Sequence, residues 1–254
     1  MAGSLFDAWV EIYEAMIDWP KRLEHEGPFY RRLFHQVRVR RALDVACGTG
    51  RHAGLFHSWG LEVEGADVSP AMIQRARERF GQDDRLRWVV RGFDESIRPP
   101  QPLDAIICVG NSLALAPDRA TMAEALRQWV AALRPGGVVV VHVLNLWQLA
   151  EGACRWQKHR RAELDGVDVF IHKGVHRCGD RGFVEVLVVP LDDPGAAKSQ
   201  SQVFWGVEAD QLEKSLVAAG AARVECFGGY QGQAYRRLES SDLVVVAVKE
   251  QANS

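Results

Sequence analysis

Three small residues, followed later by an acidic residue, predict a ligand-binding turn in the first quarter of the chain. In Asp44–Gly50, which reads DVACGTG, Ala46, Gly48 and Gly50 are spaced two apart after a short apolar run. Small side chains at this spacing let the backbone turn tightly and approach a ligand closely. Asp67 follows about twenty residues later, where a carboxylate could accept hydrogen bonds from ribose hydroxyls. The pattern predicts a nucleoside-containing cofactor and leaves its identity open.

Short apolar runs alternate with helical patterns around this turn, and these are the elements that must position it. Strands are expected at 41–46, 61–67, 86–92, 103–110 and 138–144, and later at 222–228 and 241–249. Helices are expected at 49–59, 70–80, 120–133 and 208–219. This alternation predicts an α/β fold with a mostly parallel sheet and helices on both faces. Ligands of such sheets bind at the carboxyl ends of the strands, where the glycine turn and Asp67 lie.

Two segments do not follow this alternation. Apolar residues at helical spacing cover 5–17, Pro20 is expected to end or kink that helix, and a second helix is expected at 28–36. After the fifth strand, antiparallel strands are expected at 167–175, 183–191 and 201–207. The chain is therefore divided into an N-terminal helical lid at 1–40, a core at 41–145 and 208–254, and an insertion at 146–207.

The composition is that of a globular protein with a small-molecule ligand. The 254 residues are 47% hydrophobic and carry a formal net charge of −2, which gives no overall reason to expect a nucleic-acid partner. The longest aliphatic runs, such as VVVVHVL, are too short to cross a bilayer, and no membrane partner is expected. The five cysteines are scattered without C-x-x-C spacing, which predicts reduced thiols, a cytoplasmic location and no metal site.

The segment DVACGTG resembles the first motif of the class I S-adenosylmethionine-dependent methyltransferases. Other segments similar to landmarks of that family follow in order, namely GADVSPAMI, RGFDE, LDAIICVGNS and ALRPGGVVVVHVLN. The resemblance covers 41–144 well and 208–249 more loosely. It implies S-adenosylmethionine as the cofactor and a Rossmann-like, seven-stranded, mostly parallel sheet. It also implies a helical lid at the N-terminus and an antiparallel insertion, after the fifth strand, that covers the acceptor site.

The same resemblance assigns residues to the cofactor. Asp67 would bind the ribose, the segment Gly92–Asp94 would meet the adenine, and the main chain at Val109 would hold the amino-acid end. Aromatic and basic side chains of the lid would reach the cofactor's carboxylate. The expected cofactor residues are Tyr13, Trp19, Arg22, Ala46, Gly48, Gly50, Asp67, Val68, Met72, Gly92, Phe93, Asp94 and Val109.

A closer resemblance, carried by DVACGTG, ICVGNSLALAPD and HVLN, is to glycine N-methyltransferase and its sarcosine and dimethylglycine relatives. It implies acceptor contacts from the turn after the fourth strand and from the end of the fifth. The expected substrate residues are Gly110, Asn111, Ser112 and Asn145. Asn111 is expected to orient an acceptor through its amide donor and acceptor, and a turn residue is the alternative. His142 could act as a base, although a strand histidine is more often simply packed.

One residue departs from the glycine enzymes. They carry an arginine just before the Asn that closes the fifth strand, and that arginine clamps the carboxylate of the substrate. Here Leu144 precedes Asn145. Without that bidentate cation, glycine itself is not the expected acceptor.

Several alternatives stay open at the level of sequence. The main interpretation is in-line transfer of a methyl group to an amine nitrogen of a small molecule, with oxygen or sulfur acceptors as alternatives. Gly48, Gly50 and Ala53 also satisfy the loose pattern of a nicotinamide-dependent oxidoreductase. A third hypothesis is a catalytically silent protein that binds the cofactor. The basic run at 155–161 is either a solvated face or a lining of the acceptor mouth, and a homo-oligomer stays open.

Overall fold

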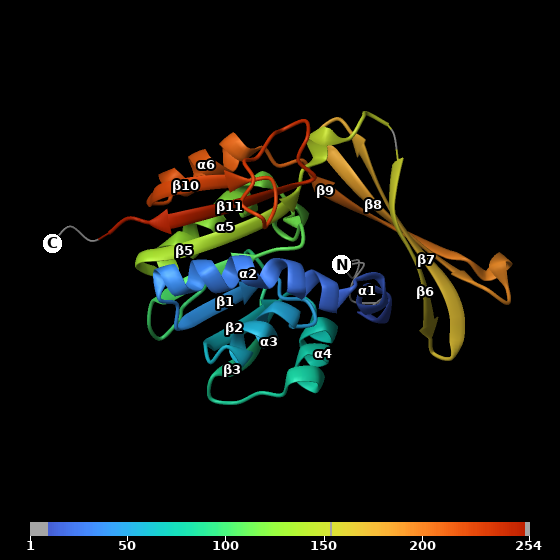
Figure 1. The fold of residues 1–254 in the computed structure, drawn as a ribbon, viewed down its shortest axis with the longest axis horizontal. Helices are drawn as coiled ribbons and strands as arrows, with labels where there is room; N and C mark the ends of the chain where they lie inside the picture. Colours follow the sequence, from blue (N-terminus) through green and yellow to red (C-terminus); the bar gives the residue numbers. More distant parts are fainter. Residues whose placement is uncertain (1–9, 153, 252–254) are drawn as a thin grey trace.

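The computed structural model describes residues 10–152 and 154–251. Its main sheet has seven strands in the order β10-β11-β5-β4-β1-β2-β3, shown in Figure 1. These strands are β1 (Arg41–Val45), β2 (Glu62–Asp67), β3 (Leu86–Val90), β4 (Leu103–Cys108), β5 (Leu133–Leu144), β10 (Ala221–Phe227) and β11 (Asp242–Lys249). Only β11 runs antiparallel to its neighbours within this sheet. The expected seven-stranded, mostly parallel sheet is confirmed.

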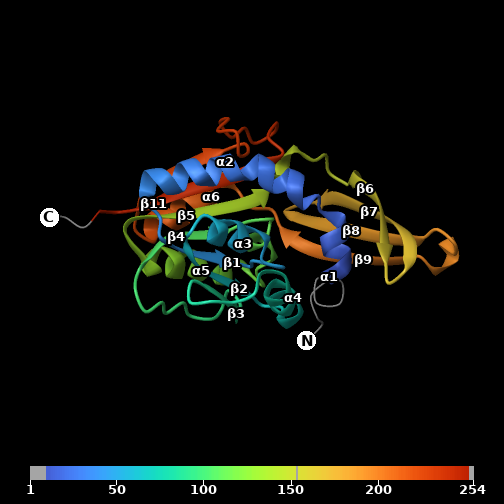
Figure 2. The ribbon, with the colours of Figure 1, turned by 60° about the horizontal axis from the view of Figure 1, so that its bottom comes forward.

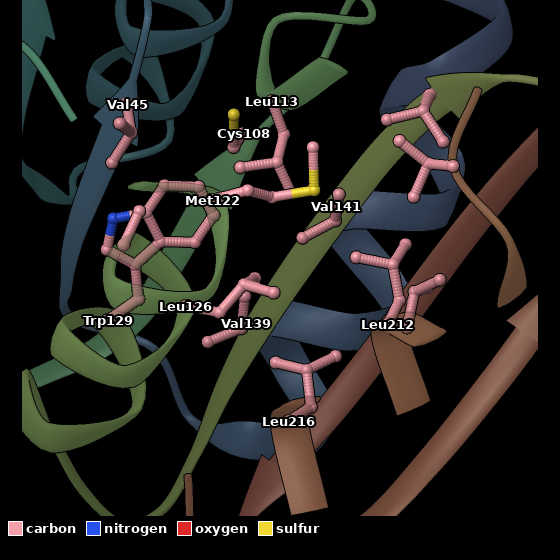
Figure 3. Packing of buried hydrophobic residues seen from close by; sticks show 14 of the residues in the cluster. Val45, Cys108, Leu113, Met122, Leu126, Trp129, Val139, Val141, Leu212 and Leu216 are labelled. Atoms are coloured by element: carbon pink, nitrogen blue, oxygen red, sulfur yellow. The ribbon is translucent and has the colours of Figure 1, made fainter. Parts of the chain in front are cut away.

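Helices cover both faces of this sheet. They are α3 (Arg51–Ser58), α4 (Pro70–Phe80), α5 (Arg119–Ala132) and α6 (Ala209–Ala218), with short 3-10 turns η1 (Leu113–Leu115) and η2 (Leu146–Gln148). Strand β5 contributes Val139 and Val141 to the cluster with α5 and α6, and Val138 and Val140 to the cluster on the opposite face. Figure 3 shows the first of these clusters. Burial on both faces explains why the segment Val138–Val141 is apolar without alternation.

The N-terminal segment forms α1 (Val10–Met16) and α2 (Trp19–Val37). The helix expected at 5–17 is seen from Val10 and ends at Met16, before Pro20, and its residues 5–9 lie outside the described range. Pro20 itself lies in the first turn of α2. Asp18 caps that turn by accepting a hydrogen bond from the Lys21 amide at 3.3 Å. A proline fits the first turn of a helix, where its missing N–H has no intrahelical partner. The second helix therefore begins nine residues before the expected start and contains Pro28 in its interior.

The insertion forms a second sheet of four antiparallel strands in the order β6-β7-β8-β9. They are β6 (Cys154–Leu164), β7 (Val167–Cys178), β8 (Arg181–Pro190) and β9 (Lys198–Trp205), with η3 (Pro194–Ala196) between the last two. Three of these strands were expected from the sequence, and β6, which contains the basic run at 155–161, was not. Charged residues occupy both of its faces, so no apolar alternation is visible in the sequence.

Helix α1 packs between the four-stranded sheet and α4 of the core. Met16 packs in one cluster with Val169 and Ile171 of β7 and Val186 of β8, and α1 also contacts α4 of the core. Figure 2 shows α1 against the four-stranded sheet. None of the helices in the described ranges is long and apolar enough to cross a membrane.

Candidate active site

A cavity of about 270 Å³ lies at the carboxyl ends of the central strands, between the core, α1 and β9. It brings together residues that are distant in the sequence. The expected residues that line it are Tyr13, Ala46, Gly48, Asp67, Val68, Met72, Gly92, Phe93, Asp94, Gly110 and Ser112. The lid, the glycine turn and the loops after β2, β3 and β4 therefore meet in one cavity.

The glycine turn adopts backbone conformations that favour small residues. Gly48 has a φ of 55° and Gly50 a φ of 78°. A Cβ on Gly48 would lie 3.3 Å from the Tyr13 hydroxyl, whereas a Cβ on Gly50 would overlap the Trp88 ring at 2.5 Å. A side chain on Gly48 would therefore crowd Tyr13 of α1 and the cavity that Gly48 lines. Gly50 does not line the cavity and is small because a core tryptophan packs against it.

Asp67 stands at the end of β2 with its carboxylate fixed by the main chain. Its Oδ2 accepts a hydrogen bond from the Gly48 amide at 2.8 Å, and its Oδ1 accepts one from the Ser69 amide at 2.9 Å. The side chain is buried, with 8% exposed, and lines the cavity. Hydrogen bonds to a charged acceptor are stronger than neutral ones. Asp67 therefore joins β2 rigidly to the glycine turn and presents a carboxylate at the cavity wall.

A second acid supports the turn from beneath. Asp44 is fully buried at the end of β1 and accepts a hydrogen bond from the Ala53 amide of α3 at 3.1 Å. Burial raises the pKa of Asp44 to about 6, against the opposing effect of His52. This acid does not line the cavity, and it holds the start of α3 against β1.

Helix α1 is anchored over the turn by ionic contacts. The Glu14 carboxylate contacts the Thr49 hydroxyl and the guanidinium of Arg51, and lies 2.7 Å from Arg79. Tyr13, one residue earlier, lines the cavity. Burial raises the pKa of Tyr13 far above its ordinary value, so its hydroxyl keeps its proton. The lid is thus fixed to the glycine turn at the same place where it covers the cavity.

Trp19 and Arg22 lie beside the cavity without lining it. The Arg22 guanidinium is 5.3 Å from the centre of the Trp19 ring, and its terminal nitrogens lie 3.7 and 3.9 Å from the position that a Cβ of Gly110 would take. The Trp19 indole nitrogen has no hydrogen-bond partner among the described residues, although the side chain is only 4% exposed. A buried donor without an acceptor costs about 1–3 kcal/mol. An anionic group of a bound cofactor, such as a carboxylate, would supply that acceptor and fits this corner.

The turn after β4 is hydrogen-bonded to β5. Asn111, which was expected to contact the acceptor, makes this bond. The Asn111 Oδ1 accepts a hydrogen bond from the Leu144 amide at 3.0 Å, and Asn111 has a φ of 73°. The Val109 carbonyl accepts a bond from the Ser112 hydroxyl at 2.8 Å. Neither Asn111 nor Val109 lines the cavity. The geometry supports the turn role of Asn111, because asparagine tolerates a positive φ better than most residues.

His142 also supports this turn. Its Nδ1 accepts a hydrogen bond from the Gly110 amide at 3.2 Å, and its Nε2 lies 3.0 Å from the Asp242 carboxylate. A carboxylate only accepts, so Nε2 carries the proton and Nδ1 carries the lone pair that Gly110 uses. In this arrangement His142 holds the turn after β4 against β11. Its expected role as a base stays a prediction.

Asn145 is committed to the loop before β11. Its amide nitrogen donates to the carbonyls of Arg237 and Ser240 at 2.8 and 2.6 Å. Its Oδ1 accepts from the Trp147 amide at 3.2 Å and the Tyr235 hydroxyl at 3.1 Å. Its side chain is 2% exposed and does not line the cavity. These four bonds use the donors and acceptors of the amide, and the expected contact of Asn145 with an acceptor stays a prediction.

The cavity also has lining residues that the sequence analysis missed, namely Arg91, Leu115, Pro117 and Gln202. Arg91 forms an ion pair with Glu64 at 2.5 Å. Three of the four lie inside or beside motifs that already pointed to the site, and those motifs could have revealed them. Gln202 comes from β9 of the insertion, where no motif marked it.

Three comparisons with known proteins agree with this geometry. Residues 42–137 match a family model described as a methyltransferase domain. The glycine/sarcosine N-methyltransferase of Parasynechococcus marenigrum (strain WH8102) is 30% identical over 95% of this chain and 83% of that protein. The sugar N-methyltransferase KedS8 from Streptoalloteichus sp. shares the fold with a TM-score of 0.75, at 24% identity, over 99% of this chain and 95% of that chain.

A third relative was solved with the cofactor bound. CalS10, an amino pentose methyltransferase from Micromonospora echinaspora, has a TM-score of 0.71 at 22% identity, over 97% of this chain and 99% of that chain. The family model and the glycine/sarcosine N-methyltransferase relative favour S-adenosylmethionine over a nicotinamide cofactor for the glycine turn. The chain belongs to the class I S-adenosylmethionine-dependent methyltransferases, within the family that includes the glycine/sarcosine N-methyltransferases.

Proposed function

We propose that this enzyme transfers the methyl group of S-adenosylmethionine to an amine nitrogen of a small molecule. The observation that carries the proposal is the lining of the cavity, which includes Gly48 of the glycine turn, Asp67 at the end of β2 and Gln202 of the insertion. An acceptor in the same cavity as the cofactor can be aligned with it while water is excluded by α1 and β9. Alignment and exclusion of water are the main requirements of a methyl transfer.

The cofactor supplies an electrophilic methyl group on a positively charged sulfur. In the proposed arrangement, Asp67 accepts hydrogen bonds from the ribose hydroxyls, and Val68, Met72 and the segment Gly92–Asp94 surround the adenine. Trp19 and Arg22 donate to the carboxylate, which satisfies the otherwise unpaired indole N–H. Charge-assisted bonds of this kind fix the orientation of the cofactor more firmly than neutral ones. Tyr13 covers the cavity from α1.

The titratable side chains of the cavity favour a nitrogen acceptor over a hydroxyl oxygen. They are Tyr13, Asp67, Arg91 and Asp94 among the described residues. Tyr13 keeps its proton, Arg91 pairs with Glu64, and Asp67 is held by two main-chain amides. Asp94 belongs to the segment that surrounds the adenine in the proposed arrangement. A hydroxyl needs a general base to become a nucleophile at neutral pH, whereas an amine exposes its lone pair once its proton has passed to solvent. The named activities of the three relatives are methylations of glycine or sarcosine, of a sugar nitrogen and of an amino pentose, and they support the same class of acceptor.

Glycine is not the proposed acceptor. Leu144 offers no cation for a carboxylate, and its amide is bonded to Asn111. An amine larger than glycine, held between Ser112 and Gln202, fits the lining of the cavity better. The apolar residues Leu115 and Pro117 on the same side favour an acceptor with some carbon surface.

The test uses methyl-labelled S-adenosylmethionine with glycine, sarcosine, a panel of amino sugars and other small amines, and a metabolite extract. Mass spectrometry identifies the labelled product and its methylated atom. Label on nitrogen that is lost in Asp67→Asn, and kept in Asp210→Asn on the exposed face of α6, is the expected result. Label on oxygen or sulfur, or turnover of glycine above all other amines, contradicts the proposed acceptor. Binding of S-adenosylhomocysteine without transfer to any acceptor would indicate a silent cofactor-binding protein.

A further inference from the structure

Helix α2 contains a buried acid that has no part in the roles described so far. Glu26 is 5% exposed, and both of its carboxylate oxygens are engaged by cationic or polar partners. Its Oε1 accepts a hydrogen bond from Nε of Arg22, one turn earlier on α2, at 2.8 Å. Its Oε2 lies 2.6 Å from Nε2 of His52. A buried carboxylate is costly unless it is paired and hydrogen-bonded, so the two partners explain how Glu26 is tolerated.

The pair of Glu26 and Arg22 is permanently ionised. Burial opposes the negative charge of Glu26, but the bond from His52 and the charge of Arg22 lower the pKa of Glu26 to about 2. Burial likewise opposes the positive charge of Arg22, and the carboxylate of Glu26 raises the pKa of Arg22 above its ordinary value.

Glu26 connects three parts of the cofactor site. His52 lies in the first turn of α3, directly after the glycine turn, so Glu26 fixes α2 to that turn. By taking Nε of Arg22, Glu26 leaves the two terminal nitrogens on the side of Gly110, 3.7 and 3.9 Å from the position of its Cβ. A guanidinium is planar, so fixing Nε also fixes the plane in which the terminal nitrogens donate.

We propose that Glu26 is a positioning residue, which orients Arg22 so that its terminal nitrogens receive the carboxylate of S-adenosylmethionine. The inference rests on the proposed function, in which Arg22 binds that carboxylate. Without Glu26 the long arginine side chain regains rotational freedom, and it must be ordered again each time the cofactor binds. The loss of Glu26 should therefore weaken the binding of ligands that carry the carboxylate, and it should leave the binding of ligands without the amino-acid tail unchanged.

Two ligands separate this role from a general structural one. S-adenosylhomocysteine carries the amino-acid tail, and 5′-methylthioadenosine carries the same nucleoside and sulfur without it. Calorimetric titration of the full-length protein measures both dissociation constants. In Glu26→Gln we expect the dissociation constant of S-adenosylhomocysteine to rise about tenfold, the size of one modest charge-assisted hydrogen bond, and that of 5′-methylthioadenosine to change less than about twofold. In Arg22→Met the same selective loss is expected, and adding Glu26→Gln to it should cost little more.

Glu124→Gln is the matched control, because it removes an exposed acid that pairs with Arg127 on α5. Neither ligand should bind it differently from the wild type. If Glu26→Gln does not fold, Glu26→Asp makes the same comparison, since it keeps the charge and withdraws the carboxylate by one methylene. Equal losses for the two ligands, or no loss for either, would overturn the role of Glu26 alone. A wild-type protein that does not bind S-adenosylhomocysteine would overturn the proposed function and this inference with it.

Discussion

The two sheets of this protein differ in what covers them. Every residue of β4 in the main sheet is buried, because helices pack on both faces. The four-stranded sheet packs one face against α1 and leaves Phe170 and Val203 40% and 46% exposed. Figure 1 shows that sheet standing to one side of the core. The glycine turn is thus built on the part of the molecule where the side chains are buried on both faces, whereas the four-stranded sheet has one face with exposed apolar side chains.

The largest expected difference between the two regions concerns stability. Trp129 is 1% exposed in the cluster of α5, β5 and α6 shown in Figure 3. Trp129→Ala should lower the free energy of unfolding by about 3–5 kcal/mol, because it removes a large apolar side chain and leaves a cavity. Denaturation with urea measures this change. A loss below about 1 kcal/mol would mean that the main sheet is no more constrained than the insertion.

Two glycines of the core, Gly50 and Gly60, separate the effect of packing from that of backbone strain. Gly50→Ala combines a positive φ with a Cβ that would overlap Trp88 at 2.5 Å, and it should cost about 2–4 kcal/mol. Gly60→Ala is the matched control, since Gly60 has a φ of 88° but no atom within 4 Å of the Cβ position. Only the backbone strain of about 1 kcal/mol is expected there. Equal costs in thermal unfolding would show that packing against Trp88 is not the reason for Gly50.

The pH dependence of stability tests the buried acid beneath the turn. The pKa of Asp44 is raised from 3.8 to about 6 by burial, so ionising it opposes folding. Its contribution is fully present below pH 4 and is lost as the pH rises through 6, by about 2–3 kcal/mol. In Asp44→Asn this fall between pH 4 and 6 should be absent, because an amide does not ionise. Unfolding in urea at a series of pH values measures it, and an unchanged profile in the variant would contradict the assignment.

The smallest effect is expected on the outer face of the insertion. Phe170→Ser removes a side chain that is already 40% exposed, and it should change the free energy of unfolding by less than about 0.5 kcal/mol. Binding of S-adenosylhomocysteine should also be unchanged. A large loss of stability, or a change in molecular mass by light scattering, would show that another chain covers this face.

Local patterns predicted the core of the fold well, and two differences remain. The second helix begins at Trp19 and not at Pro28, because a proline fits the first turn of a helix and Asp18 caps that turn. Strand β6 was missed because its charged residues obscure any alternation of apolar and polar positions. It is a strand because it pairs along its length with β7.

The sequence by itself determined the cofactor turn. The spacing of Gly48 and Gly50 after an apolar strand, with Asp67 at the end of the next strand, fixes where the backbone turns and at which end of the sheet, because these are short-range properties of the chain. Only the tertiary structure decided which side chains face the cavity. Asn145 is hydrogen-bonded to Tyr235, 90 positions away, and His142 to Asp242, 100 positions away. Gln202 reaches the cavity from the insertion. Hydrogen-bond partners of buried polar groups are set by the packing of distant segments, and no local pattern contains them.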